Sequence, residues 1–187
     1  MIPIYEQSDG NGIGHSFDSF SRRFDEICKE HLANGRARAF AFIFYDFTNS
    51  DLRDILKNDG VFAKLDRLSG TKLSIFYLHS GSRTSIKKFN QHFITALGIT
   101  DQVELPCVVF FKVQNEKIED IEIAQLDSSN LIHGFHELYT AVQRYLVAEP
   151  NVPNPESRAL KRLKGGSKFV SLELFRAVLK RGFESFF

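Results

Sequence analysis

The stretch Leu105-Pro106-Cys107-Val108-Val109-Phe110-Phe111 decides the fold, because it places a proline directly before a continuous apolar run. Such a run is typical of a central strand that is covered on both faces of a sheet. Residues 114–116 then form a turn, and apolar and polar side chains alternate over residues 118–124. Together these features predict an antiparallel hairpin over residues 108–124.

Strand and helix patterns alternate through the rest of the first 147 residues. Apolar runs predict the strands, and apolar residues spaced three and four apart predict the helices. In chain order we expect a strand at 2–5, a helix at 17–32, a strand at 38–47, a helix at 52–68, a strand at 73–78, a helix at 86–97 and, after the hairpin, a helix at 131–145. Asn58-Asp59-Gly60 should break or kink the helix at 52–68. Strands joined through helices run parallel by right-handed crossovers, so only the hairpin should add antiparallel pairs.

This order of elements over residues 2–147 resembles the thioredoxin-like fold superfamily. Tyr45-Asp46-Phe47 resembles the apolar-Asp-Phe sequence at a strand end of that family, and Leu97-Gly98-Ile99 followed by Pro106 resembles the segment around its cis-proline. The resemblance implies an α/β fold, with a thioredoxin-like mixed central sheet flanked by helices. It also implies that the Leu105–Pro106 bond is cis and that the residue before the proline offers backbone hydrogen bonds to an extended peptide. Six residues separate Ile99 from Pro106, more than is usual in the family, so we expect a reshaped groove.

The sequence departs from that family at the redox motif. The expected Cys-x-x-Cys positions fall within Ser50-Asp51-Leu52-Arg53-Asp54-Ile55, which contains no thiol. Disulfide exchange needs an attacking thiolate and a resolving thiol, so we expect no dithiol oxidoreductase activity. The favoured interpretation is a non-catalytic module that binds a protein partner. Its candidate binding residues at the groove are Leu105, Pro106, Thr48 and Asn49.

An enzyme of the same fold with non-dithiol chemistry is the alternative. Cys107 would then be the reactive thiol of a single-cysteine peroxidase or a transferase. The plainer interpretation of Cys107 is a small buried residue at the start of a strand. His133 and His136 lack a third ligand, and residues 10–16 match no nucleotide-binding motif, so we expect no metal and no cofactor.

A proline-rich segment divides the chain into two regions. Pro150, Pro153 and Pro155 mark a linker at 148–157, between a thioredoxin-like domain at 1–147 and a basic amphipathic helical segment at 158–187. Residues 151–187 carry eight Lys and Arg and three Glu, a net charge of +5, which leaves −4 for the remainder of a chain with net charge +1. This asymmetry predicts a tail that packs on its own body or binds an anionic partner.

The apolar face of the tail must be covered, because an exposed Leu or Phe forgoes about 1.5–3 kcal/mol of burial. It could pack on the first domain or a second copy of the chain, or bind a partner protein. An anionic membrane or a nucleic acid ranks below these. The candidate partner surface consists of Phe169, Leu172, Phe175, Arg176, Leu179, Lys180 and Phe183.

Composition fits an ordinary globular protein, with 43% hydrophobic and 25% charged residues. The N-terminal sequence has neither the basic region nor the apolar core of a secretory signal, and no apolar stretch approaches the length of a membrane span. Cys28 and Cys107 lie too far apart in the sequence for a redox or zinc motif. We therefore expect a reduced, cytoplasmic protein.

Overall fold

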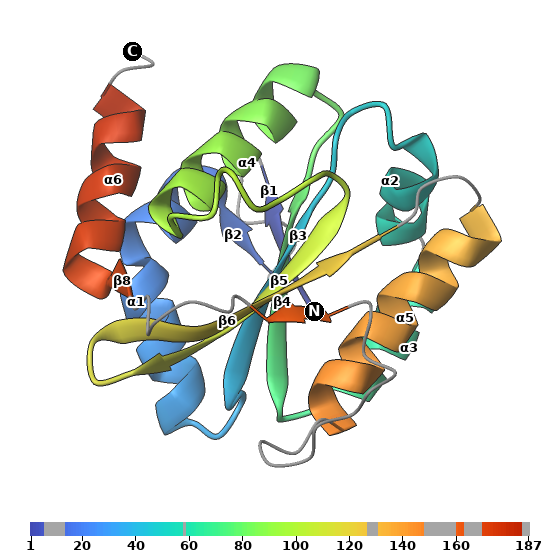
Figure 1. Cartoon of the computed structure of the whole chain (residues 1–187), viewed down its shortest axis with the longest axis horizontal. Helices are drawn as coiled ribbons and strands as arrows, with labels where there is room; N and C mark the ends of the chain where they lie inside the picture. The colour runs from blue at the N-terminus through green and yellow to red at the C-terminus, as the bar shows by residue number, and fades with distance from the viewer. Residues whose placement is uncertain (6–13, 58, 127–130, 148–159, 163–169, 185–187) are drawn as a thin grey trace.

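The computed structural model describes residues 1–5, 14–57, 59–126, 131–147, 160–162 and 170–184. Within them, the strands form one mixed sheet with helices on both of its faces (Figure 1). The strands are β1 (Ile2–Tyr5), β2 (His15–Ser16), β3 (Ala39–Phe44), β4 (Leu73–His79), β5 (Cys107–Gln114), β6 (Lys117–Gln125), β7 (Leu160–Arg162) and β8 (Val170–Ser171). The helices are α1 (Phe17–Ala33), α2 (Ser50–Lys57), α3 (Asp59–Ser69), α4 (Arg83–Ala96), α5 (Leu131–Val147) and α6 (Leu172–Glu184).

The strand directions agree only in part with those expected from the connections. The expectation that only the hairpin adds antiparallel pairs was wrong, because β5 is joined to β4 through α4 and still runs antiparallel to β3. Residues 97–106 bring the chain back to the end of the sheet where β3 finishes, so that Cys107 pairs with Phe44. The order in the sheet is β2-β1-β4-β3-β5-β6-β7, and β8 pairs with another part of β6. β1, β4 and β3 are parallel, whereas β5 is antiparallel to β3 and to β6. Asn115 and Glu116 turn the β5–β6 hairpin with φ of 48° and 60°, as a type I′ turn requires. The predicted α/β class is confirmed.

Two layers of helices cover the sheet. On one face α6 contacts both α1 and α4, and on the other α5 contacts both α2 and α3 (Figure 1). The predicted break between helices is also present, since α2 ends at Lys57 and α3 begins at Asp59. This arrangement buries both faces of β3, in which every residue is buried.

Phenylalanine fills the space between the sheet and the α1/α4 layer. Phe42 on β3 lies with its ring centroid 4.7 Å from that of Phe93 on α4, and Phe20 on α1 lies 4.8 Å from Phe76 on β4. Offset and tilted ring pairs at such distances add about 0.5–1.5 kcal/mol each beyond the area they bury. The 19 phenylalanines of the chain thus serve mainly this core.

The C-terminal segment belongs to the same core. Phe175 of α6 is fully buried, with its ring 4.7 Å from Phe24 of α1. The prediction of a helical segment over residues 158–187 was wrong in part, because residues 160–162 and 170–171 are strands that pair with β6, and the helix begins only at Leu172. Helical periodicity could not show that the edge of β6 was open for pairing. The proposed linker at residues 148–157 lies outside the described residues.

Candidate functional site

The predicted groove residues lie where several strands of the sheet end, a place that we call the Leu105 edge. β3 and β4 end there, β5 begins there, and α2 and α4 start from the same edge (Figure 1). The last register pair between β3 and β5 joins Phe44 to Cys107. Leu105 comes two residues before that pair in the segment that leads into β5, and Thr48 and Asn49 follow it in the loop after β3. The chain topology therefore brings together the two segments that the sequence singled out.

The Leu105–Pro106 peptide bond is cis, as the resemblance implied. Strand β6 holds this segment from one side. The side-chain amide of Gln125 donates hydrogen bonds to the carbonyl oxygens of Glu104 and Pro106, at 2.8 and 2.9 Å, and the backbone N–H of Leu126 donates to Pro106 at 3.0 Å. Pro106 itself is buried. The loop is consequently fixed in position by its neighbours.

Leu105 remains accessible in this fixed loop. Its side chain is 37% exposed, which is unusual for a large apolar residue in this protein. Neither its N–H nor its carbonyl oxygen has a hydrogen-bond partner among the described residues. Backbone groups beside the end of a strand that have no partner in the protein can pair with another extended chain.

The loop after β3 is ordered by its own side chains. The side-chain oxygen of Asn49 accepts a hydrogen bond of 2.7 Å from the backbone N–H of Asp46, and the N–H of Asn49 donates to the carbonyl of Asp46 at 3.0 Å. Asn49 therefore shapes the loop more than it faces a partner, whereas Thr48 is exposed. Asn90 of α4 donates to the carbonyl of Tyr45 at 2.8 Å and fixes where the loop begins.

Near the Leu105 edge, the guanidinium groups of two arginines lie against the ring of Phe47. Neither arginine was predicted from the sequence. The Phe47 ring is half-buried, with the guanidinium carbon of Arg53 of α2 4.7 Å from the ring centroid and that of Arg83 of α4 at 5.5 Å. Only the fold brings the starts of these two helices together. The one signal in the sequence was that both arginines lie near the start of a predicted helix, which is the less favourable end for a cation.

The two cysteines are unsuited to thiolate chemistry. Cys107 is fully buried, and burial raises the pKa of its thiol to about 12. Burial also raises the pKa of Cys28 well above its usual value. A thiol must ionise to act as a nucleophile, and neither side chain reaches solvent. The reactive-thiol alternative for Cys107 therefore has little support in the geometry.

The C-terminal surface predicted for a partner is occupied within the chain. Leu172, Phe175 and Leu179 are buried in the main core, and the Arg176 guanidinium pairs with the buried carboxylate of Asp25, with Nε 2.7 Å from Oδ1. The apolar face thus packs on the body of the chain, one of the alternatives that the sequence left open. Phe169 and the side chains of Lys180 and Phe183 lie outside the described residues.

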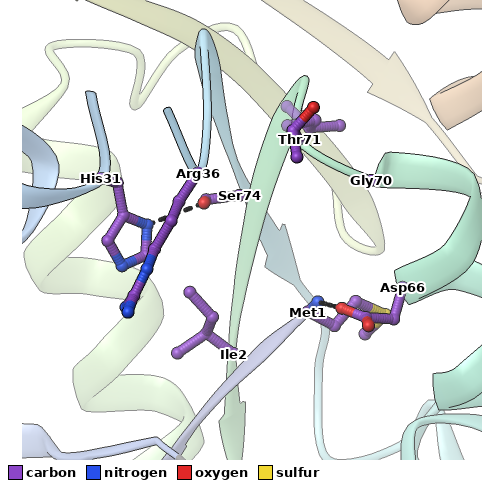
Figure 2. Close-up of a pocket in the computed structure, with 9 residues that line it drawn as sticks. Met1, Ile2, His31, Arg36, Asp66, Gly70, Thr71 and Ser74 are labelled. Atoms are coloured by element: carbon purple, nitrogen blue, oxygen red, sulfur yellow. Dashed lines mark hydrogen bonds and ion pairs between the residues drawn. The ribbon is translucent and has the colours of Figure 1, made fainter. Parts of the chain in front are cut away.

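A cavity of about 310 Å³ opens at the opposite ends of the strands, where β1 and β4 begin. Figure 2 shows His31 of α1 beside Ser74 of β4, and the hydrogen bond between Nδ1 and Oγ is 2.8 Å long. The figure also shows the amino group of Met1 paired with the carboxylate of Asp66. Burial, and secondarily the charge of Arg36, lowers the pKa of His31, so its imidazole is neutral at pH 7.

This cavity does not assemble a recognisable catalytic group. A serine–histidine pair needs an orienting third group on the histidine and donors for an oxyanion. The carboxylate of Asp66 lies in the cavity wall, but its hydrogen-bond and ion-pair partner is Met1. Ser74 is only 6% exposed. The pair is best explained as a buried hydroxyl that is satisfied by a buried imidazole.

Neither a cluster of metal ligands nor a membrane-spanning helix is found in the described part of the chain. It contains no group of three or more His, Cys, Asp or Glu side chains arranged to hold an ion. His136 is exposed, whereas the side chain of His133 and residues 10–13 of the glycine-rich segment lie outside the description. None of the described helices is long and apolar enough to cross a bilayer.

Comparison with known proteins adds no assignment. No protein-family model matches the sequence, and no curated protein shows significant similarity to it.

Proposed function

We propose that this chain is a non-catalytic, thioredoxin-like interaction module that binds an extended segment of a protein partner at Leu105–Pro106. One observation carries the proposal. Within the described structure, Leu105 offers an unpaired N–H, an unpaired carbonyl oxygen and an exposed apolar side chain in a loop that β6 holds in place. Backbone pairing supplies affinity in this mode of recognition, and a contact with the side chain supplies specificity.

Support for the thioredoxin-like assignment comes from the sheet. Its parallel strands β1, β4 and β3 continue into the antiparallel pair β5 and β6, which together give the mixed central sheet that the resemblance implies. The segment around Pro106 meets the end of β3, where that family binds peptides. The buried thiols favour binding over the alternative of a peroxidase or transferase.

The proposed partner is a protein, and a second copy of the chain is one source of the segment. The apolar face of α6 is the weaker candidate surface because the chain itself covers it. For the same reason, a membrane or a nucleic acid bound through that tail is not proposed.

Selection of random linear peptides on the native chain provides the test. Peptides that bind should lose about tenfold or more in affinity for Leu105→Asp, because the new carboxylate would be desolvated at the centre of the contact. Leu174→Asp is the matched control. Leu174 is 57% exposed on α6, so the same change there should leave the affinity unchanged.

Amide hydrogen exchange gives a second, independent measurement. The Leu105 N–H should exchange rapidly in the free protein and at least about tenfold more slowly when a selected peptide is saturating. Unchanged exchange, or peptides that bind Leu105→Asp as tightly as the wild-type chain, would contradict the proposal. Peroxide turnover that disappears in Cys107→Ser would instead support the enzyme alternative.

A further inference from the structure

Two guanidinium groups lie against the ring of Phe47, and neither has a carboxylate partner in the part of the chain that the structure describes. The guanidinium carbons of Arg53 and Arg83 lie 4.7 and 5.5 Å from the ring centroid. Neither arginine forms an ion pair with a carboxylate among the described residues. Two like charges on one ring repel each other, so a shared anion would stabilise the pair.

Arg53 is the less satisfied of the two. Its side chain is half-buried, and its Nε–H is shielded from solvent without a hydrogen-bond partner in the described structure. Other arginines of the chain do find carboxylates: Arg23 binds Glu26 and Glu30, and Arg176 binds Asp25. A buried donor without an acceptor is rare in folded proteins and points to a missing partner.

These cations lie within reach of a segment bound at Leu105. Phe47 follows the Phe44–Cys107 register pair by three residues in the loop after β3, and Leu105 precedes it by two in the segment that leads into β5. At about 3.3 Å per residue, each lies within about 10 Å of that pair. The two points are therefore at most about 20 Å apart, a distance that about six extended residues span.

We infer that the partner segment carries an aspartate or glutamate, which Arg53 and Arg83 bind beside Phe47, within about six residues of the residue that pairs with Leu105. This inference rests on the proposed function of Leu105. The planar guanidinium presents its N–H groups as a fork that matches a carboxylate. An apolar group next to the acidic residue would cover the exposed part of the half-buried ring.

The surroundings favour a single carboxylate over a polyanion. Asp46 precedes Phe47, and Asp51 and Asp54 flank Arg53 on α2, with Asp46 and Asp54 exposed. A nucleic acid places a phosphate at every residue and would meet these carboxylates. A peptide with one acidic side chain can avoid them. Binding of nucleic acid is accordingly treated as an outcome that overturns the inference.

The probes are the peptides selected on the full chain, each compared with a copy in which Asp and Glu are replaced by Asn and Gln. Arg53→Gln and Arg83→Gln should each weaken binding of the acidic peptide by about tenfold. Arg22→Gln, which removes one exposed charge from α1, is the control and should change the affinity by less than about twofold. The peptide copy with Asn and Gln should bind Arg83→Gln and the wild-type chain equally. Loss of the peptide carboxylate and loss of the arginine remove the same contact, so the second change adds nothing to the first.

The outcomes separate this inference from the proposed function. Peptides that need Leu105 but contain no acidic residue, or that bind both arginine variants normally, overturn the inference and leave the function intact. Peptides whose binding is independent of Leu105 overturn both. Binding of a single-stranded oligonucleotide that either arginine variant abolishes also overturns the inference. Acidic enrichment, together with loss in both variants and no change in Arg22→Gln, supports it.

Discussion

Two regions of this protein combine arginine with apolar side chains, and the fold treats them in opposite ways. On α6, Arg176 pairs with the buried Asp25 while Phe175 enters the core. At the Leu105 edge, Arg53 and Arg83 lie against the ring of Phe47 without a carboxylate partner among the described residues, and Leu105 stays exposed. Both were candidate partner surfaces in the sequence. Among the described residues of the two regions, only the second still has unpaired polar groups.

The difference shows what an amphipathic pattern can and cannot tell. The pattern of α6 requires that its apolar face be buried, but it does not determine which surface packs against that face. The exposed groups at the Leu105 edge come from residues with no shared periodicity. A recognition site of this kind is visible only as a set of unpaired atoms once the chain has folded.

The largest effect on stability should follow from truncating a side chain that α6 buries in the core. Phe175→Ala leaves a cavity against Phe24 and should lower the free energy of unfolding by about 3–5 kcal/mol. Leu105→Ala at the open edge should change it by no more than about 0.5 kcal/mol. Urea unfolding of both variants measures the contrast. Equal small effects would show that α6 does not belong to the core.

A second contrast compares two arginines by the same substitution. Arg176→Gln leaves the carboxylate of Asp25 buried, with the Lys29 ammonium at 3.8 Å as its remaining cation among the described residues, so stability should fall by about 2 kcal/mol. Arg83→Gln, which breaks no ion pair, should lower stability by no more than about 0.5 kcal/mol. The double variant with Asp25→Asn should recover part of the loss. No recovery would contradict the role assigned to the buried charge.

A smaller effect is expected on the pH dependence of stability, from one histidine near each end of β4. Burial lowers the pKa of His31 near one end and of His79 at the other, with secondary contributions from the charges of Arg36 and Lys57. The unfolded chain, where a histidine pKa is 6.5, then binds more protons than the folded chain. The two neutral histidines therefore make their full contribution to stability above pH 6.5. Below pH 6.5 the unfolded chain takes up protons first, and this contribution is lost as the pH falls. Unfolding free energies of His31→Gln and His79→Gln should each depend less on pH in that window than those of the wild type, and an unaltered dependence in both would contradict this assignment.

The smallest effect is expected at a residue beside the open edge. Cys107 lies two residues from the exposed Leu105 but is itself fully buried, so a thiol reagent should not modify it in the native protein. Labelling detected by mass spectrometry should appear only at the rate of unfolding. Rapid modification at neutral pH would reopen the reactive-thiol alternative.

Most of the architecture could be predicted from local pattern. The runs at 38–47 and 105–111 indicated central strands, and the turn at 114–116 indicated the hairpin. The strands β7 and β8 were missed because each is short and is defined by its pairing with β6, which local periodicity does not encode. Leu105 and Pro106 were found through a resemblance, whereas Arg53 and Arg83 were not found.

The sequence by itself determined the alternation of strands and helices, the absence of a Cys-x-x-Cys thiol pair and the need to cover the tail, because spacing and composition fix these properties along the chain. Only the tertiary structure decided that α1 and α4 cover α6 and that Arg53 and Arg83 meet at Phe47. The physical reason is that burial and charge pairing depend on which atoms lie nearby. Those neighbours come from distant parts of the sequence.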